Sequence, residues 1–242
     1  MIERDGRFEI VLNARFLRGD TSEALQVVRA LIAHEFGHVA IWQRDGQALF
    51  VYERLNEIPD SFAATRLGLA AKVLEEARVE RWLYRANLRS LERQEAGITG
   101  SLQSARQSFV ALTTNTNLDV QRLMFGVIGA FRDLITFVAY LASEDLESPF
   151  SARAPAFRTY EWANFVGPFY NDYKELLAAA PPADTATSLA MLDGYAIALA
   201  PLLDRWFSAL GYRIDDDEFG MSYFDIGGFA HDDADRYFAV SE

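Results

Sequence analysis

Apolar residues recur at steps of three and four positions through most of the chain, which is the spacing of amphipathic helices. The clearest case is residues 22–43, which we predict to be one helix. Thr21 and Ser22 can cap its beginning, and Asp45-Gly46 ends it. We expect its apolar stripe to face inward; the stripe consists of Leu25, Val28, Leu31, Ile32, Phe36 and Val39.

The same spacing predicts further helices along the chain. Pro59-Asp60-Ser61 begins one that runs to about Asn87. Four more are expected in the second half, at 101–113, 117–142, 156–179 and 184–210. Pro168 and Pro201 fall inside the last two, and we expect them to kink or break those helices.

Strand signals are short and few. Phe8 to Asn13 and Ala48 to Tyr52 are rich in β-favouring residues, and the segment from Tyr212 to Glu242 could hold a strand or only loops. We therefore predict an α+β, predominantly helical fold with a small sheet. Two glycines and a change in charge balance near residues 95–100 indicate a boundary. It would divide the chain into regions 1–97 and 98–242, or lie within one compact unit.

The composition excludes several classes of binding partner and active site. The chain has 35 acidic and 23 basic residues and a net charge of −12, so we expect no binding to nucleic acids or anionic membranes. It has no cysteine, which excludes disulfides, thiolate zinc sites and a cysteine nucleophile. The charged beginning of the chain lacks the pattern of a signal peptide, so we expect a cytoplasmic protein. Arg132 and Asp133 interrupt the longest apolar stretch, which favours a core helix over a membrane span.

Residues 34–38 carry the most specific chemical signal, because His34-Glu35-Phe36-Gly37-His38 is an HExxH motif inside a predicted helix. Residues four apart share a helix face, so both imidazoles can reach one ion. Glu35 is then placed to act on a metal-bound water as a general base. Only three histidines occur in the chain, and two are in this motif. Gly37 costs about 1 kcal/mol in a helix interior, which indicates close packing there, against the strand or the metal site.

A third ligand is needed for a catalytic zinc site. Ile41 and Arg44 stand where the longer metzincin pattern has glycine and histidine, so that class is disfavoured. The acidic stretch 74–82 on the next predicted helix offers Glu75, Glu76 and Glu80 instead.

At this point the chain resembles the gluzincins, over roughly residues 8–86, and most closely the small, compact members and bacterial metallopeptidase domains. In that family a strand precedes the HExxH helix, and a later helix carries a ligand followed four residues later by a second acid. The resemblance implies a zincin-like core with Zn²⁺ bound by His34, His38 and Glu76, and with Glu80 orienting a histidine. Glu75 is the rival ligand, but Val79 stands where its second acid would be.

The end of the chain supplies weaker candidates. Gluzincins often use a histidine or tyrosine to stabilise the oxyanion, a role open to His231, Tyr223 or Tyr195. A surface histidine in an acidic loop is the competing interpretation of His231. A second hypothesis is that this segment covers the cleft and that Asp232 keeps the enzyme latent.

The sequence therefore predicts a zinc-dependent peptidase acting on peptides or proteins, with endo- and exopeptidase activity both open. The alternative is a non-catalytic binding or regulatory protein on a zincin scaffold, with a structural or lost metal site. Intact Glu35 argues for catalysis, because a purely structural site has no use for a general base.

Overall fold

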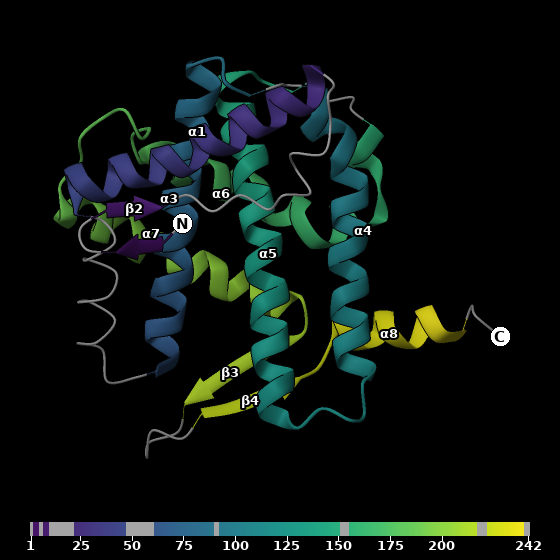
Figure 1. Ribbon diagram of the computed structural model, residues 1–242. Helices are drawn as coiled ribbons and strands as arrows, with labels where there is room; N and C mark the ends of the chain where they lie inside the picture. Colours follow the sequence, from purple (N-terminus) through teal and green to yellow (C-terminus); the bar gives the residue numbers. More distant parts are fainter. Residues whose placement is uncertain are drawn as a thin grey trace.

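The computed structural model describes residues 2–4, 7–9, 22–46, 61–89, 92–150, 155–216 and 222–239. These residues are mostly helical, with two small antiparallel sheets of two strands each, as Figure 1 shows. The helices are α1 (Ser22–Asp45), α3 (Ser61–Arg85), α4 (Glu92–Thr114), α5 (Val120–Glu147), α6 (Gly167–Ala179), α7 (Leu189–Ala209) and α8 (Phe229–Ala239). The strands are β1 (Ile2–Arg4), β2 (Arg7–Glu9), β3 (Tyr212–Asp216) and β4 (Ser222–Ile226). The predicted helical character is confirmed.

Helix α5 lies at the centre of a helical bundle. It packs against α3, α4 and α6, while α3 also packs against α7, and α1 crosses one end of the bundle (Figure 1). By length and composition α5 is the one helix in the described part of the chain that could span a membrane. In this structure its Phe131, Leu134 and Val138 side chains are buried in the core, and Arg132 and Asp133 are exposed.

The predicted boundary near residue 97 does not interrupt the structure. Gly97 and Gly100 lie inside α4, which begins near residue 92, well before the start expected from the sequence. Ile98 and Leu102 are fully buried and share one hydrophobic core with Leu74 and Phe131. Burial of such side chains stabilises by about 1.5–3 kcal/mol each, which outweighs the cost of about 1 kcal/mol for each helical glycine.

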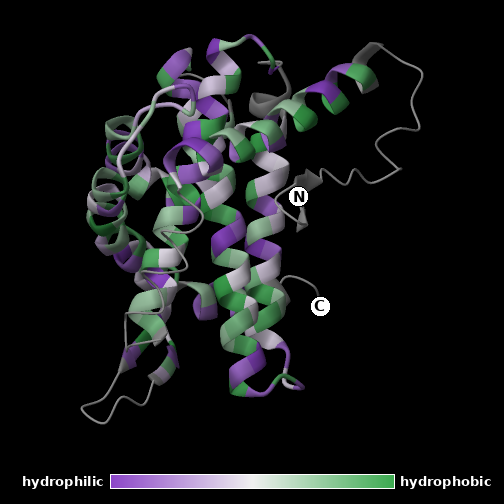
Figure 2. Ribbon diagram, turned by 60° about the vertical axis from the view of Figure 1, so that its left-hand side comes forward, coloured by the Kyte–Doolittle hydropathy of each residue, from purple (hydrophilic) through white to green (hydrophobic). Residues whose placement is uncertain are grey.

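The orientation predicted for α1 is wrong in part. The helix has the expected bounds, and Gly46 ends it with a φ of +66°. However, Leu25 and Phe36 of the predicted inward stripe are 66% and 57% exposed. Figure 2 shows the first part of α1 projecting beyond the other helices. The second part packs against α3 through a small second core of Ile41, Val79, Leu83 and Ala183.

The two internal prolines have different effects. Pro168 stands in the first turn of α6 and follows a π-helical segment, Trp162–Val166, so the predicted helix 156–179 is interrupted there. A 3₁₀ turn, Pro155–Arg158, precedes it. Pro201 lies inside α7, which continues through it to Ala209, so of the expected kink or break the break does not occur.

The last segment contains more structure than the sequence predicts. Gly211, with a φ of +92°, ends α7 and leads into the β3–β4 hairpin, and α8 follows. Helix α8 lies where the sequence pattern predicts none, although Asp232 in its first turn is a typical helix-start residue. Of the predicted strands, 48–52 lies outside the described residues, and only Phe8 and Glu9 of 8–13 lie inside them, in β2, where they pair with β1.

Candidate metal centre

The site forms where α1 packs tightly against α3. A Cβ atom on Gly37 would lie 2.7 Å from Val79 Cγ1 and 3.3 Å from Trp82 Cε3. Only glycine allows this approach without displacing Val79. The predicted close packing at Gly37 is thus confirmed, but the partner is α3 rather than a strand or the metal ligands. The approach turns His34 and His38 toward the acidic face of α3.

Three atoms that could bind a metal ion converge there, and they belong to the three residues that the sequence analysis names. The Nε2 atoms of His34 and His38 lie 3.0 Å apart, and Glu76 Oε2 lies 3.2 Å and 3.6 Å from them. For ligands about 2.05 Å from a tetrahedral zinc ion, neighbouring donor atoms would be about 3.3 Å apart. The three distances bracket this value, so the donor set has the spacing that a small tetrahedral cation requires.

Both imidazoles are held in the orientation that such a site needs. His34 Nδ1 donates to Glu80 Oε1 at 2.7 Å, and His38 Nδ1 donates to Glu75 Oε1. With each Nδ1 held by a carboxylate, each Nε2 faces Glu76 and is the atom that would give its lone pair to a cation. Three acceptor atoms so close together repel one another unless a cation or a proton lies between them. Glu75, the rival ligand, thus orients His38 and does not join the donor set.

Glu76 has two further partners. Tyr140 of α5 donates its hydroxyl to Oε2 at 2.8 Å, and Lys72, one turn earlier on α3, lies 2.8 Å from Oε1. Burial would raise the pKa of Glu76, but hydrogen bonds from His34 and His38 and the charge of Lys72 outweigh it and hold that pKa well below its usual range. The carboxylate is therefore ionised and available as a ligand.

The cluster binds positive charge strongly. Burial opposes charging of His34, yet hydrogen bonds to Glu76 and Glu80 raise its pKa to about 9. The pKa of His38 is raised for the same reason, by Glu75 and Glu76 against the effect of burial. Protons therefore supply positive charge to the cluster when no cation does. A metal ion would displace them.

Glu35 and an open groove lie next to the donor set. Glu35 is partly exposed, and its charge is among those that raise the pKa of Lys72 against the effect of burial. Lys72 and Glu76 also line a groove of about 310 Å³ between α3 and α5. The α5 side of this groove is lined by Arg132, Asp133, Thr136, Phe137 and Tyr140. The general-base candidate and the candidate ligand Glu76 therefore border solvent-accessible space.

Of the candidates from the end of the chain, His231, Asp232 and Tyr223 lie on elements away from this site. His231 and Asp232 are exposed on α8, which packs against α4, and Tyr223 is 56% exposed on β4. Figure 1 places α8 and the β3–β4 hairpin at the end of the bundle away from α1. Tyr195 lies on α7 against the main core. The structure thus gives no support to a catalytic role for these residues or to latency imposed by Asp232.

Sequence reasoning missed several residues that contact the site. Lys72 precedes Glu76 by one helical turn, so its pairing could have been found from spacing. Trp42 likewise follows His38 by one turn of α1, whereas Tyr140 and Arg89 have no such signal. Trp42 Nε1 donates to Glu75 Oε1 at 3.0 Å, and Arg89 Nε donates to Glu80 Oε2 at 2.6 Å. These contacts join side chains from separate segments and depend on the fold.

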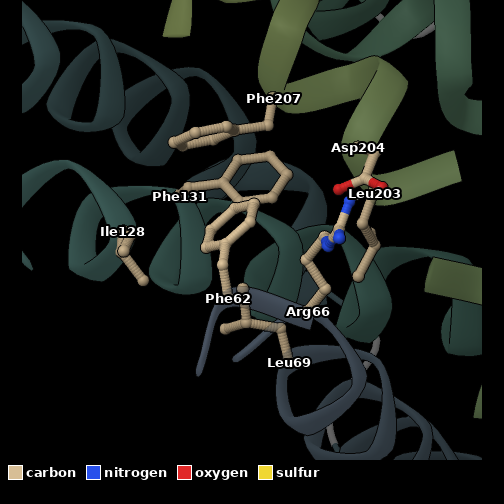
Figure 3. Close-up of a pocket in the computed structure, with 8 residues that line it drawn as sticks. All are labelled: Phe62, Arg66, Leu69, Ile128, Phe131, Leu203, Asp204 and Phe207. Atoms are coloured by element: carbon tan, nitrogen blue, oxygen red, sulfur yellow. Dashed lines mark hydrogen bonds and ion pairs between the residues drawn. The ribbon is translucent and has the colours of Figure 1, made fainter. Parts of the chain in front are cut away.

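A second, apolar pocket lies elsewhere on the α3–α5 pair, where α7 also contributes (Figure 3). Arg66 and Asp204 form an ion pair of 2.7 Å at its edge. Its volume is about 20 Å³, which is room for about one water molecule. The other lining residues are Phe62, Leu69, Ile128, Phe131, Leu203 and Phe207. A pocket this small has no room for a substrate.

Searches against protein-family models, curated proteins and solved structures find no match to this chain.

Proposed function

We propose that this chain is a zinc-dependent peptidase in which His34, His38 and Glu76 hold the ion and Glu35 is the general base. The observation that carries the proposal is the convergence of two Nε2 atoms and one carboxylate oxygen at 3.0–3.6 Å, with both Nδ1 atoms bound to carboxylates. Two imidazoles, one carboxylate and no thiolate form a donor set that suits catalytic zinc.

A zinc ion at this position would lower the pKa of a water molecule and polarise the carbonyl of a peptide bond. Glu35 follows His34 directly and projects about 100° round the helix from it, so it flanks the donor set without joining it. It would take the proton of the attacking water and pass it to the leaving amine. Lys72 and Tyr140 line the groove beside Glu76 and would be donors for negative charge on the reacting carbonyl oxygen.

The groove between α3 and α5 supports a substrate of some length. Its α5 wall extends from Tyr140 to Arg132, eight residues away, which corresponds to about 12 Å along the helix. An extended peptide advances about 3.3 Å per residue, so about three to four residues would fit beside the site. This length is in keeping with a peptide or protein as the substrate.

The test combines metal content with hydrolysis. We expect about one zinc ion per wild-type chain by mass spectrometry, loss of the ion in Glu76→Ala, and retention in Glu175→Ala, a matched change of an exposed glutamate on α6. Glu35→Gln should keep the ion but cleave a peptide library at least about 100-fold more slowly. Wild-type protein that takes up no zinc even after incubation with the ion would refute the proposal.

The alternative, a non-catalytic binding or regulatory protein, predicts a different combination. Zinc would then be bound by the wild type and by Glu35→Gln alike, and neither would hydrolyse any peptide. The partly exposed Glu35 and the open groove next to Glu76 favour the catalytic interpretation. A closed structural zinc site would instead have all its positions filled by protein ligands.

A further inference from the structure

The turn that follows α3 returns the chain toward the metal centre. Leu88 N–H donates to Leu83 O at 3.0 Å, and Asn87 N–H donates to Tyr84 O at 3.0 Å. Asn87 has a φ of +57°, so the turn is a Schellman motif with asparagine at the left-handed position. Leu88 packs beside Leu83 in the small second core, which fixes the turn. Arg89, the next residue, is thereby directed back along α3.

Arg89 contacts two different sides of the metal centre. Its Nε atom donates to Glu80 Oε2 at 2.6 Å, and the Glu80 side chain is fully buried. Its guanidinium carbon also lies 5.5 Å from the centre of the Tyr140 ring. Charge-assisted bonds to a buried carboxylate are strong, and a guanidinium stacked on an aromatic ring adds a further attraction.

These contacts close a ring of five side chains. Arg89 bonds to Glu80, Glu80 to His34, and His34 approaches Glu76; Glu76 accepts from Tyr140, and Tyr140 lies against Arg89. Two members of the ring are candidate metal ligands, and each is held by one residue that Arg89 touches. A single guanidinium thus contacts both the residue that holds His34 of α1 and the residue that holds Glu76 of α3.

We propose that Arg89 is a positioning residue of the metal centre, which holds His34 through Glu80 and Glu76 through Tyr140. This inference rests on the metal site of the proposed function, but it concerns metal affinity and ligand geometry rather than hydrolysis. Without Arg89, Glu80 would lose its guanidinium partner and could turn away from His34. Tyr140 would lose the cation that fixes its ring.

The substitution that tests this role is Arg89→Met, which keeps an unbranched apolar stem but removes the charge and the N–H donors. Loss of an outer partner of this kind typically weakens metal binding about 10–100-fold, and we expect a loss in that range. We also expect the visible absorption of the Co²⁺-loaded protein to change, because the ligand geometry relaxes. Arg85→Met is the matched control, since Arg85 lies near the same end of α3 and pairs with Glu147.

Two further variants separate positioning from a general loss of structure. Arg89→Lys can still bind Glu80, so it should recover most of the affinity, although it cannot stack flat on Tyr140. In a Glu80→Gln background, Arg89→Met should have much less effect, because the path through Glu80 is already cut. Thermal melting in chelator shows whether each variant folds.

The outcomes are distinguishable. Weaker zinc binding and an altered Co²⁺ spectrum in Arg89→Met, with Arg85→Met unchanged, support the inference. Unchanged affinity and spectrum in a folded Arg89→Met overturn it while leaving the metal site intact. An altered Arg89→Met together with a wild type that hydrolyses no peptide supports the role of Arg89 and counts against the peptidase. Wild-type protein that binds no metal overturns both proposals.

Discussion

Gly37→Ala tests how closely α1 and α3 must approach. In an open helix this change stabilises by about 1 kcal/mol, because alanine has the higher helix propensity. Here the new Cβ would lie 2.7 Å from Val79 Cγ1, about 1 Å inside normal carbon–carbon contact. Val79 is fully buried and β-branched, so it cannot rotate away easily. The helices must therefore separate.

Overpacking of this kind typically costs about 1–3 kcal/mol, so we expect a net loss of up to about 2 kcal/mol in the free energy of unfolding. Gly97→Ala is the matched control, because Gly97 is an exposed helical glycine of α4, and a Cβ atom added there would have no neighbouring atom within 4 Å. It should stabilise by up to about 1 kcal/mol. Zinc affinity should fall in Gly37→Ala only. Gly37 precedes His38 and Val79 precedes Glu80, so separating the helices at this contact moves the histidines away from the carboxylates of α3.

The assay is urea unfolding in chelator, followed by zinc titration against a competing dye. Adding Val79→Ala removes the methyl groups that the new Cβ would meet. The pair should therefore lose less stability than the sum of the two single changes. A Gly37→Ala variant that is as stabilised as Gly97→Ala, with unchanged zinc affinity, would refute the close-approach argument.

Three further predictions concern the surroundings of the site. Asp45→Asn should destabilise by about 3–5 kcal/mol at neutral pH, because the fully buried Arg78 side chain loses the carboxylate charge 2.8 Å away that compensates its own. Burial raises the pKa of Asp45, but hydrogen bonds from Arg44 and Arg78 outweigh it and hold that pKa below 3.8. The extra stability of the wild type over Asp45→Asn should therefore decrease as pH falls below 3.8. An equal difference in their free energies of unfolding at pH 7 and pH 3, measured in urea, would contradict the reasoning. Glu75→Gln should weaken zinc binding about 10–100-fold in a chelator competition, because the amide orients His38 less strongly; an unchanged affinity would show that Glu75 is dispensable. Asp233→Asn should lower the free energy of unfolding by about 1–2 kcal/mol, because it weakens the two hydrogen bonds from Arg106 that hold α8 against α4. Calorimetry should show unaltered zinc binding, and a weaker affinity would contradict the placement of α8.

The parts of the site that follow from helix spacing could be predicted. His34 and His38 are four residues apart, as are Glu76 and Glu80, so each pair shares a helix face whatever the tertiary structure. The sequence could not show that α1 and α3 present these faces to each other. It also could not show that Glu75 would bind His38, because a one-residue shift on a helix changes direction by about 100°.

The errors share a physical cause, which is competition between local and tertiary preferences. Gly97 and Gly100 indicated a break, but the burial of Ile98 and Leu102 keeps α4 continuous. The apolar stripe of α1 indicated an inward face, but the approach at Gly37 turns the histidine face inward and leaves Phe36 outside. Tyr140 and Arg89 reach the site from segments for which the sequence carries no metal-site pattern.

The docking of α1 through a small core of its own also bears on how the protein opens. Ile41, Val79, Leu83 and Ala183 form a cluster separate from the main core, and the first part of α1 projects beyond the bundle. Amide protons of α1 should therefore exchange with solvent through a local detachment that leaves α4, α5 and α7 folded. A bound cation would link α1 to α3 and slow that exchange selectively, since detachment would first require release of the ion. The metal centre would then control how often α1 detaches from the rest of the protein.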